Sequence, residues 1–394
     1  MRQMEVLRFE PLDVFSIRTA RPFDIGGVTH ADYVWPPPPW TVMGALRGAL
    51  AELLGLPAVE YGRPHSEHPR YASVTEVIGP PDGAARFKIG PVLPGVWQEA
   101  ERQLRLRWPL PADVLSVKDG SQQGSTRLAR LRPFRLPPGV HCNQPGGRTH
   151  ALLPPADLPE HPEKSPTVRH FGTEQIAQWL AGEEITAAYS DRQEDDMDYY
   201  PEPRIGIRID PETHLVSEGL FYLRTALQLA RNRSLAVPLV HAGKDIPWAQ
   251  IDGHLARFGA DGHLVRIRKP IHVSLPECPA GKPLHHARLL CVGPTHPHAI
   301  AALERRNPPV HVRAVAAGRP VRIGGWKLLA QVRNGSEIPQ GPRRLRTYYP
   351  PGAVLYVESE GDLRELHCQN LAHDPEEEAA GFGFCLVGLW QQEQ

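Results

Sequence analysis

Apolar residues along the chain recur at two spacings, which predict a few helices among many short strands. From residue 41 onward they fall at helical spacing, and this pattern predicts a helix with Thr41 as its N-cap and Gly55 just after its end. Further helices are predicted at residues 173–181 and near 298–306. Most other apolar runs are short and alternating, as in strands. Strands mixed with a few helices, without a regular strand-helix alternation, predict an α+β fold.

The predicted strands lie in both halves of the chain. They cover residues 5–17 (with a break at Pro11), 74–80, 86–94, 113–119, 204–210, 214–229, 235–240, 263–269, 287–293, 326–332, 353–359 and 382–389. Residues 214–229 also fit a helical spacing, but the strand is the preferred interpretation.

An acidic stretch, "DRQEDDMDYYPEPR", has the composition of a solvated linker and predicts a domain boundary near Pro203. We therefore expect two domains, residues 1–202 and 203–394. The first would contain a loop-rich inserted region at about residues 61–170, where basic turns join short strands.

Charge is unevenly distributed although the formal net charge is zero. Residues 101–150 carry nine Lys and Arg against three acidic residues, and residues 151–200 carry three against eleven. This predicts one basic and one acidic surface. With 41% hydrophobic residues, no long apolar run and no secretory pattern at the N-terminus, we expect a globular cytoplasmic protein without a membrane span.

Enzyme and metal signatures are weak. The five cysteines are far apart without a CxxC pair, which argues against disulfides and a zinc ribbon. A histidine-rich segment could ligate a metal, but its spacing fits no known pattern and a chance cluster is favoured; its members are His285, His286, Cys291, His296 and His298. "HAGKDI" lacks the rest of a phosphate loop, and "GFGFCLVG" has too little chain after it for a dinucleotide fold. No cofactor and no metal is predicted.

Two basic segments suit single-stranded RNA. Residues 313–346 hold eight Lys and Arg against one acidic residue, and include "RIGGWK", in which two glycines and Trp326 lie among cations. Cations neutralise phosphates, aromatic rings stack on bases and glycines permit close backbone approach. The loop-rich region adds Lys118, Arg127, Arg130, Arg132 and Arg135. A solvated basic face explains the composition of both segments equally well.

The combination of "RPFDIGG" and "WPPPPWTVMGALRGAL" closely resembles the N-terminus of a RAMP-superfamily family, the third subunit of the Cmr effector complex in type III-B CRISPR systems. "RIGIRIDPETHLVSEGLFYLRTAL", "RPVRIGGWKLLAQV" and the glycine-rich "GFGFCLVG" are similar to later segments of that family. One departure is Trp326, which follows the Gly-Gly pair where the family pattern has an acidic residue. Residues 56–200 match only as a long, irregular insertion.

The resemblance implies two ferredoxin-like (RRM-like) RAMP domains and an inserted β-hairpin thumb that wedges into the guide-target RNA duplex. Our first choice for the thumb is the basic run from Lys118 to Arg135. The resemblance also implies a non-catalytic subunit at the foot of the complex, which holds the 5′ handle of the CRISPR RNA. Its protein partners would be the large polymerase-like subunit and a backbone RAMP subunit.

The same resemblance, read together with the basic segments, gives candidate RNA-binding residues. They are Arg21, Gly26, Gly27, His30, Arg47, Lys118, Arg127, Arg130, Arg132, Gly324, Gly325, Lys327, Gly381, Phe382 and Gly383. Arg47 would reach a phosphate or pair with Asp24. Structural alternatives stay open: Arg21 and Asp24 can pair within their loop, Arg47 can be an exposed helix residue, and Phe382 can be an ordinary strand residue.

Two other functions are compatible with the sequence. One is a RAMP-type endoribonuclease that processes precursor CRISPR RNA, with His30 as general base in metal-independent attack by the 2′-hydroxyl. The other is an interaction module that offers "WPPPPW" to an aromatic groove. We favour a structural turn instead, in which the prolines lead rigidly into the helix and Gly44 and Gly48 allow that helix to pack closely on a sheet.

Overall fold

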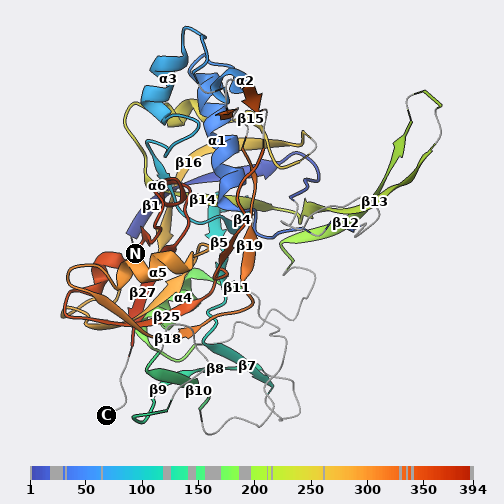
Figure 1. The fold of residues 1–394 in the computed structure, drawn as a ribbon. Coiled ribbons are helices and arrows are strands. Elements are labelled where there is room, and N and C mark those ends of the chain that lie inside the picture. Colours follow the sequence, from blue (N-terminus) through green and yellow to red (C-terminus); the bar gives the residue numbers. More distant parts are fainter. Residues whose placement is uncertain are drawn as a thin grey trace.

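Two antiparallel sheets lie face to face, with helices on their outer faces (Figure 1). The computed structural model describes residues 2–17, 30–31, 33–63, 65–118, 126–140, 148–155, 170–185, 197–210, 212–213, 216–260, 262–327, 331–333, 336–338 and 341–390. Most elements in this part of the chain are strands, which confirms the predicted α+β class. Its helices include none with the length and apolar character needed to cross a bilayer.

The first sheet contains strands from both halves of the sequence. Its strand order is β15-β16-β1-β14-β4-β5. The bounds are β1 (Arg2–Pro11), β4 (Leu93–Gln98), β5 (Gln103–Leu106), β14 (Arg233–His241), β15 (His254–Arg257) and β16 (Leu264–Leu275), and β3 (Lys88–Ile89) also pairs with β14. The predicted boundary between residues 202 and 203 falls inside a strand, β12, and does not separate the sheets. The chain passes to the second sheet between Leu275 and His286.

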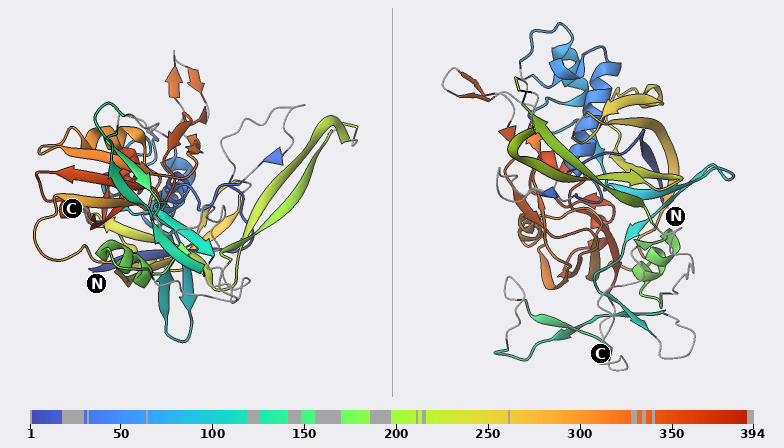
Figure 2. Two further views of the ribbon diagram at one scale, coloured as in Figure 1. Left: turned by 90° about the horizontal axis from the view of Figure 1, so that it is seen from below. Right: turned by 90° about the vertical axis from the view of Figure 1, so that its right-hand side faces the viewer.

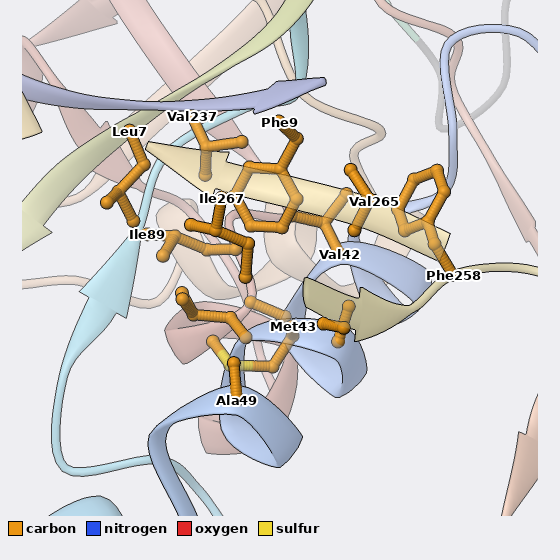
Figure 3. Packing of buried hydrophobic residues seen from close by; sticks show 14 of the residues in the cluster. Leu7, Phe9, Val42, Met43, Ala49, Ile89, Val237, Phe258, Val265 and Ile267 are labelled. Carbon is orange, nitrogen blue, oxygen red and sulfur yellow. The ribbon is translucent and has the colours of Figure 1, made fainter. Parts of the chain in front are cut away.

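Helix α1 (Pro39–Leu53) covers the outer face of the first sheet. Its apolar positions, including Val42, Leu46 and Leu50, are buried as the periodicity predicts, against Leu7, Phe9, Val237, Val265 and Ile267 of the sheet (Figure 3). Burial of these side chains is the main source of the helix's stability, because its N-terminus has no side-chain cap.

The predicted N-cap of this helix is wrong by three residues. Pro38 occupies the N-cap position and Pro39 begins the helix, so Thr41 lies within the first turn. Proline suits this position because the first helical N–H groups have no partner inside the helix. The predicted role of the glycines is also wrong: Gly44 faces open space, and Gly48 faces Ala58 of α2 (Ala58–Tyr61) rather than the sheet.

The second sheet has the order β18-β25-β17-β27-β26. Its strands are β17 (His286–Cys291), β18 (Val310–Ala316), β25 (Val354–Ser359), β26 (Gln369–Asn370) and β27 (Phe384–Leu389). Helix α5 (Pro297–Leu303) packs on the outer face through Ile300 and Leu303. On the inner face, Leu290, Phe384 and Leu386 join a core with Val6, Leu93 and other residues of the first sheet.

The inserted region contributes small elements around this core. They are α3 (Tyr71–Ile78), β6 (Trp108–Pro109), β7 (Val114–Lys118), β8 (Thr126–Arg130), β9 (Arg132–Arg135), β10 (His150–Leu153), β11 (His170–Phe171) and α4 (Thr173–Ala181). Helix α4 was predicted correctly. The strand predicted at residues 74–80 is instead part of α3, because Val74, Val77 and Ile78 also fit helical spacing.

Two long ribbons extend from the body of the molecule. One is the hairpin of β12 (Tyr199–Ile209) and β13 (Val216–Leu229), which projects away from the sheets and pairs midway along β13 with β2 (His30–Ala31) (Figures 1 and 2). The other, named here the glycine ribbon, spans residues 321–348; its strands are β19 (Val321–Ile323), β20 (Trp326–Lys327), β21 (Gln331–Arg333), β22 (Ser336–Ile338), β23 (Gly341–Pro342) and β24 (Arg346–Tyr348). Short helical turns η1 (Trp248–Ile251), η2 (Leu363–Leu366) and α6 (Pro375–Ala379) complete the fold.

Candidate nucleic-acid interface

The first tryptophan of "WPPPPW" packs against the root of the β12–β13 hairpin. The ring of Trp35 lies 4.5 Å from that of Tyr199, the first residue of β12, measured between ring centroids. Tyr33 makes an edge contact with the same ring at 5.6 Å, and the Tyr199 hydroxyl donates to the Tyr33 hydroxyl at 3.3 Å. Three aromatic residues therefore join the segment before the prolines to the projecting hairpin.

The second tryptophan packs against the two glycine-rich segments. The ring of Trp40 lies 4.9 Å from that of Phe382, in the "GFGF" loop, and the guanidinium of Arg343 stacks over Trp40 at 4.2 Å. Phe382 also contacts Tyr348 of β24, at 5.1 Å. Trp40 thus joins the start of α1 to both the "GFGF" loop and the glycine ribbon.

Acidic residues of α6 neutralise part of the basic ribbon. Arg343 donates to Glu376 at 3.2 Å, and Arg346 donates to Glu377 at 2.7 Å. Glu377 is only 1% exposed and also accepts from the Tyr348 hydroxyl at 2.7 Å. Burial and this carboxylate raise the pKa of Tyr348. The count of cations in this segment therefore overstates the positive charge that the surface presents.

Described residues on either side of "RPFDIGG" connect to the segment before the prolines and to the β12–β13 hairpin. Arg21, Gly26 and Gly27 lie outside the described residues. Before the loop, the Ile17 carbonyl accepts from the Val34 N–H at 3.2 Å. After it, His30 and Ala31 form β2, which pairs in parallel with Leu223 and Arg224 of β13. The residues that follow the predicted handle-binding loop therefore attach to the middle of the hairpin.

In the glycine ribbon, Gly324 and Gly325 separate β19 from β20, and Lys327 ends β20. Gly325 has φ +150° and its carbonyl accepts from the Arg343 N–H at 2.8 Å. This turn brings the ribbon back beside the guanidinium that stacks on Trp40. RNA contact at these three positions stays a prediction.

Gly381, Phe382 and Gly383 are buried inside the protein. A Cβ on Gly381 would lie 2.0 Å from the Gly90 carbonyl oxygen, and one on Gly383 would lie 2.1 Å from that of Leu371. Both glycines have positive φ. The Phe382 ring is 1% exposed between Trp40 and Tyr348, so it is a core residue in this chain and presents no face for a base. The surroundings of all three residues favour internal packing over direct RNA contact.

Arg47 makes contacts within the helical corner of the first domain. Its Nε donates to the Tyr61 hydroxyl at 2.7 Å, and its terminal nitrogens donate to the carbonyls of Gly83, at 3.1 Å, and Pro80. These bonds tie α1 to α2 and to the loop after α3. The environment of Arg47 therefore favours a structural role, and Asp24, its predicted alternative partner, lies outside the described residues.

The basic run from Lys118 to Arg135 forms parts of two hairpins rather than basic turns. Lys118 ends β7 and Arg127 lies on β8, which pair with each other. Arg130 donates to the carbonyls of Gly182, at 3.2 Å, and Glu183, at 2.8 Å, at the end of α4. Burial and the nearby Arg288 lower the pKa of Arg130 to about 10. Arg130 is therefore a helix-end anchor, whereas Arg132 and Arg135 are exposed on β9.

A cavity of about 960 Å³ lies between these hairpins and the second sheet. Its lining combines cations and aromatic rings with three glutamates, and includes Arg130, Arg132, Arg135, Arg313, His150 and Trp390. Arg313 is paired with Glu358 at 2.7 Å. Burial lowers the pKa of His150, so this side chain adds no charge at neutral pH.

The histidine-rich segment at residues 285–298 is dispersed. The His285 ring contacts the Ser359 carbonyl, Cys291 is buried in the second sheet, and His296 accepts from the His298 N–H at the start of α5. Among the residues that the structure describes, no three His, Cys, Asp or Glu side chains are grouped to hold a metal ion. The chance-cluster interpretation agrees with this arrangement.

The sequence profile of the family described as CRISPR-associated protein (Cas_Cmr3) matches residues 7–390, nearly the whole chain. The chain belongs to this family. The resemblance drawn from "RPFDIGG" and "WPPPPW" is thereby confirmed. A search of curated proteins finds no match.

Two solved chains align with most of the sequence at low similarity. One is described as "Cryo-EM structure of the Type III-B Cmr-beta bound to cognate target RNA and AMPPnP, state 1"; it has a TM-score of 0.45 and 12% identity, and the alignment covers 89% of this chain and 86% of that chain. The other is described as the type III-B Cmr-beta bound to cognate target RNA; it has a TM-score of 0.43, 14% identity and the same coverage. The family assignment rests on the sequence profile.

Residues that connect the motifs were missed at the sequence level. Trp35, Trp40, Tyr199 and Arg343 come from three separate segments, and their contacts join the hairpin, the glycine ribbon and the "GFGF" loop. The two tryptophans were visible as the flanks of "WPPPPW". Their partners were not, because neither contact follows a helix or strand periodicity.

Proposed function

We propose that this member of the Cmr3 family is a non-catalytic RNA-binding subunit of a type III-B effector complex. It holds the 5′ handle of the CRISPR RNA at the foot of the complex and joins the large polymerase-like subunit to the backbone. Family membership supports the assignment to such a complex. The handle-binding role carries over from the motifs that match the family.

One observation carries the proposal: the polyproline turn has one tryptophan on the β12–β13 hairpin and the other on two glycine-rich motifs that are distant in sequence. Trp35 contacts Tyr199 at the root of the β12–β13 hairpin. Trp40, five residues later, contacts the "GFGF" loop and Arg343 of the glycine ribbon. A handle bound at this junction would meet side chains that are already packed against one another, so little further ordering of them is needed.

The sheets support a ferredoxin-like plan for both domains. Numbered by their order along the chain, the four main strands of the first sheet lie in the order 4-1-3-2, as β16-β1-β14-β4. The second sheet has the same order, as β27-β17-β25-β18, with α5 between its first two strands. Two copies of one strand order agree with two related RAMP domains.

For the thumb, the β12–β13 hairpin is a better candidate than the run from Lys118 to Arg135. It is longer than the β7–β8 hairpin and projects from the body of the molecule (Figure 2). Its side chains include Ile205, 68% exposed, and Ile209, 55% exposed. Exposed apolar side chains on a projecting ribbon suit insertion between bases, which requires a wedge rather than a cation. The basic run then serves as a backbone-contacting surface.

The basic surface is tested by charge reversal at the two exposed arginines of β9. Replacing Arg132 and Arg135 by Glu should lower the affinity of the assembled complex for guide RNA about tenfold or more and make that affinity less dependent on salt. The matched control, Arg305→Glu with Arg306→Glu, makes the same charge change at exposed positions after α5. Filter binding at several salt concentrations measures the affinity and its salt dependence for each pair of substitutions. Equal effects of the two pairs would contradict a specific surface.

The two alternatives make different predictions. An endoribonuclease would cleave a repeat-containing transcript and lose that activity in His30→Ala; such a result would overturn the non-catalytic assignment. A polyproline ligand needs accessible prolines, yet Pro37, Pro38 and Pro39 are buried and both tryptophan rings are packed. The structure therefore disfavours the interaction module.

A further inference from the structure

We propose that the segment from Trp35 to Trp40 is a rigid spacer that sets the position of the β12–β13 hairpin relative to the glycine ribbon. The inference rests on the proposed function, because it assigns these two ribbons to one RNA path. Its basis is the pair of aromatic contacts at the two ends of the segment, one to each ribbon.

At the hairpin end, three kinds of contact hold the hairpin, two at its root and one midway along β13. The Trp35 ring packs on Tyr199 at 4.5 Å. Phe15 and Leu227 exchange two backbone hydrogen bonds, of 2.9 and 2.8 Å, which attach β13 to the segment after β1. The short β2 adds a parallel pairing to the other side of β13. The root of the hairpin is therefore attached to the body, while its far part projects.

At the ribbon end, the spacer is continuous with a buried helix. Pro39 begins α1, whose Val42, Leu46 and Leu50 are fully buried against the first sheet. Trp40 lies on the first turn, between the Phe382 ring and the Arg343 guanidinium. A shift of this tryptophan would displace both partners, since Phe382 is itself enclosed by Tyr348.

Between the two tryptophans the chain has little freedom. All four residues are prolines, whose φ is fixed by the ring, and three of them are buried. A flexible connection would need at least one residue that rotates freely, such as glycine. The segment therefore holds the root of the hairpin in a fixed position relative to α1, and the hairpin does not move independently of the body. For an RNA that passes both ribbons, this fixes which nucleotide reaches the hairpin once the handle is bound.

The mechanical claim is tested on the full-length chain by pulsed EPR. Spin labels at Ile205→Cys on β12 and Thr347→Cys on β24, with Cys142 and Cys278 replaced by serine, should give one narrow distance distribution. Trp35→Ala combined with Tyr199→Ala should at least double its width, and Trp35→Phe should retain it. Pro37→Gly with Pro38→Gly provides an independent loosening if the aromatic variant does not fold.

The control for this measurement is Trp97→Ala, which removes a partly buried tryptophan of the first sheet that stacks with Arg8. It should leave the distribution unchanged. A distribution as narrow as that of the unmodified chain in both loosened variants would overturn the spacer.

The consequence for RNA is tested in the assembled complex with a photo-crosslinking amino acid at Ile205. The unmodified spacer should direct crosslinks to one guide nucleotide, and the loosened variants should spread them over neighbouring nucleotides while the handle stays bound. If crosslinks stay at one nucleotide in the loosened variants, the spacer inference fails. If Ile205 of the protein with the unmodified spacer crosslinks to no RNA, the proposed RNA path fails, whatever the EPR result.

Discussion

At the scale of single residues, the glycines of the "GFGF" loop allow two backbones to meet inside the protein. Gly381 packs against the carbonyl of Gly90, which follows β3 of the first sheet, and its own carbonyl would lie 2.5 Å from a Cβ on Gly293. The loop therefore lies where the two halves of the molecule interlock. This glycine-rich motif therefore acts on the packing between the two sheets, and through it on any surface that they form together.

Gly381→Ala should lower the free energy of unfolding by about 3 kcal/mol, because it adds a backbone clash to the cost of positive φ. Gly253 is the matched control, since its φ of +80° is close to the +91° of Gly381 but no atom lies within 4 Å of its Cβ position. Gly253→Ala should cost about 1 kcal/mol. Urea denaturation of both variants gives the comparison. Equal losses would mean that the contact with Gly90 contributes nothing.

At the scale of elements, His367 joins the second sheet to the segment that crosses between the sheets. Its Nε2–H donates to the Pro276 carbonyl at 3.1 Å, and its Nδ1 accepts from the Val387 N–H of β27 at 3.1 Å. The second bond requires the neutral ring, because a protonated Nδ1 cannot accept. Burial lowers the pKa of His367, which agrees with this neutral state.

The protein should therefore lose stability on acidification. Because the folded-state pKa lies below the ordinary value, the unfolded chain binds more protons once the pH falls below about 6.5, and a single histidine then costs up to roughly 1.4 kcal/mol per pH unit. His367→Gln should therefore reduce the loss of unfolding free energy between pH 7.5 and 5.5 by up to roughly 1.4 kcal/mol per pH unit below 6.5. Denaturation at each pH measures this loss. His311→Gln, at an exposed position on β18, is the control and should leave the dependence intact.

Elements were largely predictable from the sequence, whereas their partners were not. The buried stripe of α1, helix α4 and the strands around residues 204–229 all follow periodicities that local burial imposes. The return of β14, β15 and β16 to the first sheet could not be predicted, because periodicity carries no information on pairing. The basic segments were overstated because their acidic partners, such as Glu376 and Glu358, come from distant positions.

At the scale of the whole molecule, a buried polar network fastens the inserted region to the second sheet. Asp113, just before β7, is fully buried and accepts from the Trp179 indole of α4 and the Tyr356 hydroxyl of β25, both at 2.9 Å. Arg288 of β17 pairs with the same carboxylate at 3.4 Å and donates to the Trp179 carbonyl at 2.6 Å. Burial and Asp113 raise the pKa of Tyr356, so the hydroxyl stays a donor.

Removing both charges of this pair should cost less than the two single removals added together. Asp113→Ala or Arg288→Met leaves an unpaired buried charge, and each should lower the free energy of unfolding by about 3–5 kcal/mol. The double variant should be destabilised by less than the sum, by on the order of 2 kcal/mol or more, because neither charge is then left alone. Chemical denaturation of the four proteins gives this coupling directly. Additive losses would show that the ion pair does not hold the inserted region, and that its position depends on the apolar contacts of Trp108 and Trp179 alone.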